Sequence, residues 1–380
     1  MSEAIIPFTV AIPQAALDDL GERLDLARWP EAETVDDWSQ GVPLAVLQPL
    51  VEYWRNGYDW RRCEARLNSL PQFMTEIDGL DIHFIHVRSV HANATPLLLT
   101  HGWPGSILEF VEAIPRLVDP EAHGGTAADA FHVVIPSLPG YAFSAKPEQT
   151  GWGLERTSRA WGTLMARLGY DRWFAQGGDW GSAVTTTIGQ LGVPGCAGVH
   201  VNLMYAQPPE RALTDPTPEE AHALERYRFY NEDDHGYALE QRTRPQTVGY
   251  SLVDSPVGLA AWILEKVYAW TDNAGSPFDA LSRDQVLDEI TLYWLTATGA
   301  SSARMYWEAL GRAMDRRTIE VPMGFSLFPG EIFPTPIDWV RAAWPTLVYA
   351  NKLEKGGHFA AWEQPELFVD ELRAAFAAMR

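Results

Sequence analysis

One stretch constrains the fold of this chain more than any other: residues 173–184, which read Trp-Phe-Ala-Gln-Gly-Gly-Asp-Trp-Gly-Ser-Ala-Val. A short apolar run ends in two glycines, Asp179 follows, and apolar residues then recur at helical spacing from Val184 to Leu191. A strand, a very tight turn and a helix in this order are typical of a nucleophile elbow, where small residues let the backbone bend sharply. The usual residue at the centre of such a turn is serine, whereas here it is Asp179.

Asp179 has two interpretations. A carboxylate is already ionised at pH 7, so it can attack carbon without a base to activate it. Aspartate is also a favoured N-cap residue at the start of a helix. This stretch alone does not separate a nucleophile from a cap, and the rest of the chain has to decide between them.

Composition limits the classes of function. The 380 residues exceed one average domain, so we expect a core with an inserted or appended part. With 16 Trp and 13 Tyr, the chain has enough aromatic side chains to line a pocket. A net charge of −21 argues against nucleic acid and anionic membranes as partners, because both repel an acidic protein. Cys63 and Cys196 are far apart and indicate neither a disulfide framework nor a zinc site.

The sequence has no obvious membrane or export signal. No window approaches the roughly 18 consecutive apolar residues that a membrane-spanning helix needs. The first residues also lack a basic region followed by an apolar run. We therefore expect a cytoplasmic protein.

Four segments differ in pattern. Residues 1–72 indicate short helices broken by prolines, and residues 73–205 alternate strand-like with helical runs, beginning with a hairpin at Asp78-Gly79. Such alternation predicts a mostly parallel sheet with sites at the carboxyl ends of its strands. Residues 206–318 are helical and aromatic, which predicts an inserted lid, and strand-like runs resume in residues 319–380. The expected class is α/β: a mostly parallel sheet flanked by helices, an inserted helical lid and an N-terminal helical segment.

A second turn predicts backbone donors for the site. The run His-Gly-Trp-Pro-Gly at residues 101–105 follows a strand-like segment. Pro104 has no N–H group, so the donor aimed into the site would be that of Trp103. The N–H of Trp180, directly after Asp179, would complete an oxyanion hole.

A base and an acid are expected near the C-terminus. Of ten histidines, His358 is the best candidate base, because it follows the last strand-like run in the chain order nucleophile, acid, histidine. The acid should follow residues 321–326, where Glu331 and Asp338 are available. Glu331 is nearer the strand end and would orient the imidazole and stabilise its cation. The alternative for Glu331 is an exposed loop carboxylate without a catalytic role.

Six blocks of this sequence resemble the microsomal-type epoxide hydrolases of the α/β-hydrolase superfamily. They are HGWPGS, PSLPGYAFS, QGGDWGS, SPVGLAAWILEK, GFSLFPGEIF and GGHFAAWEQPE. The resemblance runs from about residue 5 to the C-terminus and likens residues 1–72 to the N-terminal meander of that family. It implies that Asp179 is the nucleophile, Glu331 the charge-relay acid and His358 the base.

The resemblance also implies two catalytic tyrosines in the lid. These are Tyr237 in His-Gly-Tyr and Tyr306 in Arg-Met-Tyr-Trp, although Tyr227 and Tyr230 lie close to Tyr237 in the sequence. Packing in the core of the lid is the alternative role for each of these tyrosines. Membrane-bound members of the family carry an N-terminal anchor helix, which we do not expect here.

The expected function is therefore an epoxide hydrolase that converts an apolar epoxide to a vicinal diol. An ester would form on Asp179, and water activated by His358 would hydrolyse it. No cofactor or metal is expected, the partners are the substrate and water, and a homodimer is an open alternative to a monomer. A haloalkane dehalogenase uses the same Asp–His–acid triad and is the first alternative function. A catalytically silent protein that binds an apolar small molecule is the second.

Overall fold

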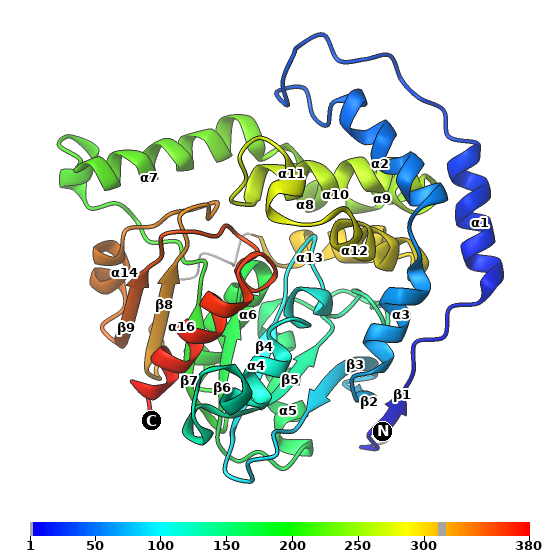
Figure 1. Cartoon of the computed structure of the whole chain (residues 1–380). Helices are drawn as coiled ribbons and strands as arrows, with labels where there is room; N and C mark the ends of the chain where they lie inside the picture. Colours follow the sequence, from blue (N-terminus) through cyan, green and yellow to red (C-terminus); the bar gives the residue numbers. More distant parts are fainter. Residues whose placement is uncertain (1–2, 311–316) are drawn as a thin grey trace.

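The computed structural model describes residues 3–310 and 317–380 (Figure 1). Within these residues nine strands form one sheet in the order β1-β2-β3-β5-β4-β6-β7-β8-β9. The pairings from β1 to β5 are antiparallel, and those from β5 to β9 are parallel. The strands are β1 (Ile6–Phe8), β2 (Gln72–Ile77), β3 (Leu80–Val87), β4 (Thr95–Thr100), β5 (Phe131–Pro136), β6 (Trp173–Gly177), β7 (Cys196–Val201), β8 (Met323–Leu327) and β9 (Leu347–Lys352).

The α-helices of the described residues fall into three groups along the chain. The N-terminal group is α1 (Gln14–Asp25), α2 (Leu44–Asn56) and α3 (Trp60–Asn68). The group that we call the lid lies between β7 and β8 and comprises α7 (Pro218–Phe229), α8 (Gly236–Thr243), α9 (Pro245–Asp254), α10 (Pro256–Trp270), α11 (Pro277–Ala280), α12 (Arg283–Leu295) and α13 (Gly299–Ala309). The group around the sheet is α4 (Ile114–Val118), α5 (Leu154–Arg167), α6 (Asp179–Leu191), α14 (Ile337–Ala343), α15 (Ala360–Glu363) and α16 (Pro365–Ala377).

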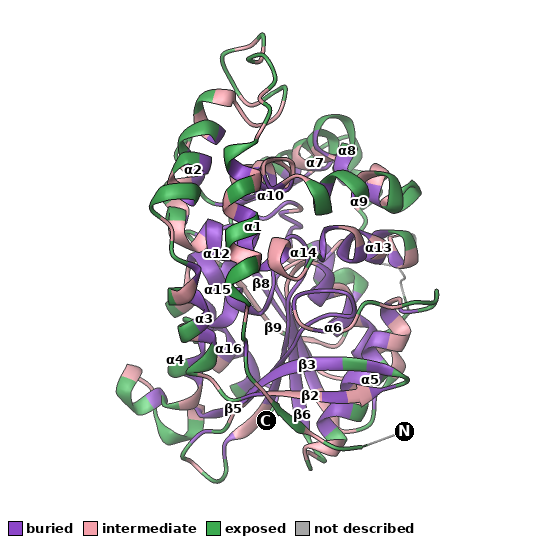
Figure 2. Cartoon of the chain, turned by 90° about the vertical axis from the view of Figure 1, so that its right-hand side faces the viewer, coloured by how far each residue is buried: buried purple, intermediate pink, exposed green. Residues whose placement is uncertain are grey.

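The sheet is buried on both faces. Successive side chains of a strand point to opposite faces, so in β4 Leu98 packs in one core cluster with Val184 of α6. Its neighbour Leu97 packs in the other cluster with Phe376 of α16. Helices α5 and α6 pack together, as do α4 and α16, and the central strands between them are buried (Figure 2). This three-layer arrangement confirms the α/β class.

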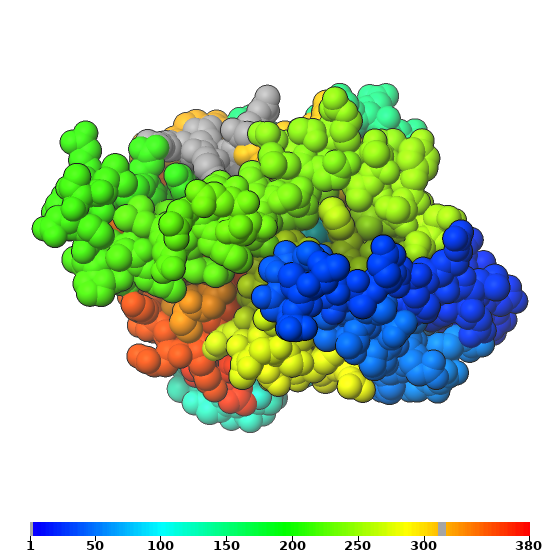
Figure 3. Space-filling view, turned by 90° about the horizontal axis from the view of Figure 1, so that it is seen from above, coloured from blue at the N-terminus to red at the C-terminus, as the bar shows by residue number. Residues whose placement is uncertain are grey.

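The N-terminal helices lie alongside the lid (Figure 3). Arg23 of α1 forms an ion pair with Asp254 at the end of α9, with 3.1 Å between nitrogen and oxygen. Trp38 stacks on Tyr268 of α10, with 3.8 Å between ring centroids and 9° between ring planes. These contacts join the first 70 residues to the lid rather than to the sheet alone.

The hairpin at Asp78-Gly79 is confirmed, because β2 and β3 pair on either side of it and both residues have positive φ angles, 52° and 79°. The expectation of short helices throughout residues 1–72 is wrong at Ile6–Phe8, which form β1 and pair with β2. This strand has only three residues and contains Pro7, which lowers strand propensity. An edge strand tolerates proline because one side of it makes no ladder hydrogen bonds.

The segment boundaries at 72, 205 and 318 stay predictions. Residues 1–2 of the N-terminal segment and 311–316 of the lid segment lie outside the described residues. Across the described ranges, no single helix is long and apolar enough to span a membrane; α9 and α10 reach that length only together and are bent by 116°. The expected cytoplasmic location stays a prediction.

Two glycines allow the tight turn between β6 and α6. A Cβ atom on Gly177 would lie 2.0 Å from the carbonyl oxygen of Gly181. A Cβ atom on Gly181 would lie 1.8 Å from the carbonyl oxygen of Thr100 at the end of β4. Both obstacles are backbone atoms, which cannot rotate away. Glycine therefore lets the start of α6 lie directly against the neighbouring strand.

We expect Gly181→Ala to destabilise the protein by about 3 kcal/mol, because the added methyl group forces two backbone segments apart. Urea denaturation measures this change. Gly21→Ala is the matched control: a Cβ atom there meets only the Arg55 side chain at 3.5 Å. Since Gly21 is inside α1, the control should gain about 0.5–1 kcal/mol. Equal stability of the two variants would contradict the steric explanation.

Candidate active site

Asp179 begins α6 in a strained conformation. Its φ angle is +48°, in the left-handed region that residues other than glycine seldom adopt. Strain of this kind costs on the order of 1–3 kcal/mol and is concentrated at functional sites. The carboxylate faces the end of β4, and its Oδ1 accepts a hydrogen bond of 2.7 Å from the backbone N–H of Trp103. The Asp179 side chain is therefore held by the turn that follows β4.

Both donors predicted for an oxyanion hole lie next to this carboxylate. The backbone N–H of Trp103 donates a hydrogen bond to it. Gly102 provides the space that the carboxylate needs, because a Cβ atom on Gly102 would lie 2.0 Å from Oδ1 of Asp179. Trp180 is in the first turn of α6, where an N–H group has no preceding helical carbonyl to bond. The N–H of Trp180 is thus free to face a ligand at Asp179.

His358 connects Asp179 to Glu331. Its Nε2 lies 3.1 Å from Oδ2 of Asp179, and its Nδ1–H donates to Oε1 of Glu331 at 2.5 Å. Glu331 follows β8 and His358 follows β9, and a parallel bridge between Gly330 and Gly357 aligns the two loops. The three predicted residues therefore form one hydrogen-bonded row, although they are far apart in the sequence.

Asp338, the other candidate acid, lies elsewhere. Its side chain is 90% exposed and pairs with Arg341. Glu331, in contrast, has no exposed side-chain surface. The structure thus brings Glu331 to the imidazole and leaves Asp338 at the surface.

The two carboxylates change the proton affinity of His358. Burial by itself would lower the pKa of this imidazole, but the charges and hydrogen bonds of Glu331 and Asp179 outweigh it and raise the pKa well above its usual value. The direction of this effect matters for the reaction, because any change that removes the negative charge of Asp179 lowers the pKa of His358. A lower pKa lets the imidazolium lose its Nε2 proton, and the neutral imidazole that results can accept a proton from water.

Tyr237 of α8 and Tyr306 of α13 reach down from the lid to the tryptophans beside Asp179. Tyr237 stacks on Trp103, with 5.0 Å between centroids and 11° between planes. Tyr306 meets Trp180 edge to face at 4.8 Å. Both phenols are at least 94% buried, and burial raises their pKa values well above the usual value of 10. They therefore stay protonated at neutral pH and can donate a hydrogen bond.

A cavity of about 490 Å³ lies between Asp179 and these phenols. Its wall is mostly apolar and aromatic and includes Leu203, Met204, Tyr205, Ile332, Phe333 and Trp344. Few charged side chains reach it besides Asp179, so an apolar molecule of moderate size fits its chemistry.

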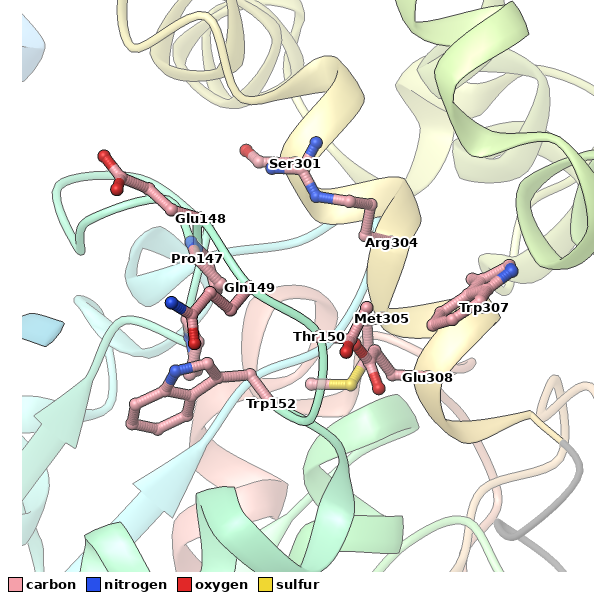
Figure 4. Close-up of a pocket in the computed structure, with 11 residues that line it drawn as sticks. Pro147, Glu148, Gln149, Thr150, Trp152, Ser301, Arg304, Met305, Trp307 and Glu308 are labelled. Atoms are coloured by element: carbon pink, nitrogen blue, oxygen red, sulfur yellow. The ribbon is translucent and has the colours of Figure 1, made fainter. Parts of the chain in front are cut away.

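A separate cavity of about 270 Å³ lies between α13 and the loop that precedes α5 (Figure 4). Arg304 and Trp307 of α13 line it, together with Gln149 and Thr150 of the loop. Met305 belongs to this cavity, whereas the next residue, Tyr306, lines the cavity over Asp179. Helix α13 therefore separates the two spaces, and none of the predicted catalytic side chains lines the smaller one.

Sequence reasoning missed two buried carboxyl groups near His358. Glu363 accepts hydrogen bonds from the backbone N–H groups of Gly357 and Phe359, both at 3.0 Å, and so fixes the loop that carries His358. Burial raises the pKa of Glu109 to about 8. The signal for Glu109 was a single acidic residue inside the apolar run at residues 107–110. Glu363 had no comparable signal.

Comparisons with known proteins support the same family along the whole chain. Residues 5–110 match the family described as "Epoxide hydrolase N terminus", and residues 95–230 match the family described as "alpha/beta hydrolase fold". A protein of Stigmatella aurantiaca is 56% identical over 376 residues, which cover 99% of this chain and 86% of that protein. Epoxide hydrolase 1 of Sus scrofa is 37% identical over 98% of this chain and 88% of its own length.

Solved structures agree with the sequence comparisons. The structure of Aspergillus niger epoxide hydrolase has a TM-score of 0.90 and 36% sequence identity, and the match covers 99% of this chain and 97% of that one. The sheet, the lid and the N-terminal helices are thus shared, not the sheet alone. The chain belongs to the microsomal-type epoxide hydrolases, a family of enzymes with the α/β-hydrolase fold.

Proposed function

We propose that this epoxide hydrolase opens an apolar epoxide through a covalent ester on Asp179. One observation carries the proposal: a carboxylate from the core and two protonated phenols from the lid line the same apolar cavity. Asp179 comes from the core, and Tyr237 and Tyr306 come from the lid. An epoxide needs a nucleophile at carbon and an acid at oxygen, and this cavity offers both.

The first step forms the ester. The Asp179 carboxylate attacks an epoxide carbon, the carbon–oxygen bond breaks, and the electron pair goes to the ring oxygen. Tyr237 and Tyr306 donate hydrogen bonds to that oxygen, and one of them transfers its proton to the alkoxide. Strain at Asp179 and the bond from Trp103 support this step, because they fix the carboxylate before substrate arrives.

The second step hydrolyses the ester. Ester formation removes the charge of Asp179, so the pKa of His358 falls and the imidazolium releases its Nε2 proton to solvent. The neutral Nε2 can then take a proton from water. The hydroxide attacks the ester carbonyl, and the N–H groups of Trp103 and Trp180 stabilise the oxyanion. When this intermediate collapses, the ester C–O bond breaks, and the departing diol oxygen takes the proton of the added hydroxyl group, which leaves Asp179 as a carboxylate. Glu331 stabilises the imidazolium until the diol leaves.

The buried phenols favour this function over that of a haloalkane dehalogenase. A halide leaves as a stable anion and needs N–H donors, not an acid, whereas an alkoxide is strongly basic and needs a proton. Two protonated tyrosines beside Asp179 suit the alkoxide. A silent binding protein would have no need for the row of Asp179, His358 and Glu331.

The ester should accumulate when its hydrolysis is blocked. We expect His358→Gln, incubated with styrene oxide, to gain the mass of one styrene oxide on Asp179, because ring opening needs no imidazole base. Intact-protein and peptide mass spectrometry measure the adduct. The double variant Asp179→Asn, His358→Gln is the control and should gain no mass. An unmodified His358→Gln protein, with wild-type enzyme that forms diol, would contradict the covalent step.

Loss of either lid phenol should slow ester formation. We expect Tyr237→Phe and Tyr306→Phe each to reduce the single-turnover rate of alkylation by about 10²-fold, and the double variant to lose far more. Tyr170→Phe is the matched control: its hydroxyl bonds His86 far from the cavity, and its rate should stay normal. Near-normal alkylation in the double variant would show that the acid lies elsewhere.

A further inference from the structure

The phenol of Tyr230 lies beside that of Tyr237, and the mechanism above gives it no role. The two phenol oxygens are 3.1 Å apart, and both side chains line the cavity over Asp179. We propose that Tyr230 is a positioning residue for Tyr237: it directs the Tyr237 hydroxyl toward the epoxide oxygen and returns a proton to Tyr237 after ring opening. This inference rests on the proposed function.

The direction of the hydrogen bond follows from what Tyr237 has to do. A phenol has one proton to donate, so Tyr237 cannot donate to the epoxide oxygen and to Tyr230 at once. When Tyr237 donates to the substrate, its oxygen can still accept, and Tyr230 is the donor 3.1 Å away. The bond therefore favours the rotamer of the Tyr237 hydroxyl that points into the cavity.

The same bond strengthens as the reaction proceeds. Proton transfer to the alkoxide leaves negative charge on the oxygen of Tyr237, and a hydrogen bond to a charged oxygen is about twice as strong as one to a neutral oxygen. Tyr237 is almost fully buried, so water cannot easily provide that bond. Tyr230 can provide the bond, because its oxygen lies 3.1 Å from that of Tyr237. Its side chain is only partly buried.

The protons balance over one turnover. The proton of Tyr237 goes to the alkoxide, the proton of Tyr230 replaces it, and Tyr230 regains a proton from solvent. His358 releases one proton to solvent after the ester has formed and regains one from water during ester hydrolysis. No further acid or base is consumed.

A buried ion pair holds the two phenols together. Tyr230 begins a π-helical turn that ends at Asp234, and such turns are frequent at functional sites. Asp234 lies 2.5 Å from Nζ of Lys266 and accepts a hydrogen bond of 2.9 Å from the Trp270 indole. The same ammonium lies 4.6 Å from the ring centroid of Tyr237. Lys266 thus fixes the end of the turn and the ring of Tyr237 relative to each other.

Tyr227 provides a comparison in the same wall. It lies three residues before Tyr230, and Phe333 packs against both rings, at 5.2 and 4.7 Å between centroids. Its hydroxyl, however, is 2.6 Å from Oγ1 of Thr335 and does not reach Tyr237. Substitution of Tyr227 by phenylalanine therefore removes a buried hydroxyl without touching the proposed pair.

The experiment compares two probe epoxides, propylene oxide and its trifluoromethyl analogue, whose alkoxide is much less basic. Alkylation and ester hydrolysis are measured separately in single turnovers, by the fluorescence of the tryptophans beside Asp179. For Tyr230→Phe we expect alkylation by propylene oxide to slow at least about tenfold, because a charge-assisted hydrogen bond is lost. The trifluoromethyl analogue should slow by about threefold or less, since its oxygen needs less help from an acid.

Ester hydrolysis should stay within about twofold of wild type in Tyr230→Phe, because it does not use the lid phenols. Tyr227→Phe should keep the wild-type ratio of the two alkylation rates. A difluorotyrosine at position 230 keeps the ring and the donor, so it should restore the ratio that phenylalanine changes.

Three results would overturn the inference: an equal loss with both epoxides, an equal loss in both steps, or no restoration by difluorotyrosine. Each would mean that the Tyr230 ring packs the lid and that its hydroxyl does not serve Tyr237. Failure of the proposed function has a different outcome, because wild-type enzyme would then form no ester with either epoxide.

Discussion

The strained turn at Asp179 is the constraint on which the rest of the site depends. A left-handed aspartate at the start of α6 points its carboxylate at the neighbouring strand's turn, where Trp103 donates to it. This arrangement is possible only because Gly102, Gly177 and Gly181 leave no side chains in the way. The sheet and its two layers of helices hold the turn in place. The strain is therefore maintained by the core and not by local preference.

The lid contributes the acid half of the site, so its position has to be fixed relative to the sheet. The backbone N–H of His358 donates to the carbonyl of Trp270 in the lid at 2.8 Å, which joins base and lid directly. On the outside, the N-terminal helices contact the lid through Trp38 and Arg23. The N-terminal segment is therefore in direct contact with the lid that carries Tyr237 and Tyr306.

Local patterns predicted those parts of the molecule that depend on neighbouring residues. The strand–turn–helix pattern around Asp179 predicted the elbow, and the position of His358 and Glu331 after late strands predicted a row that the structure brings together. The catalytic roles of these residues stay predictions, as does the homodimer. Sequence spacing had no information on the π-helical turn that begins at Tyr230; its last residue, Asp234, meets Lys266, which is 32 residues further along the chain. It also could not separate Glu331 from a surface carboxylate, since burial is a property of the folded chain.

The covalent role of Asp179 is the central claim, and the origin of the diol oxygen tests it most directly. Asp179 could instead act as a base for water that attacks the epoxide. Both routes give the same diol, so steady-state rates do not distinguish them. One turnover in ¹⁸O-labelled water, with enzyme in excess, separates them. If Asp179 is the nucleophile, the new diol oxygen comes from its carboxylate, so the diol should be mostly unlabelled and the label should remain in Asp179. Labelled diol in the first turnover, with an unlabelled Asp179, would contradict the covalent mechanism.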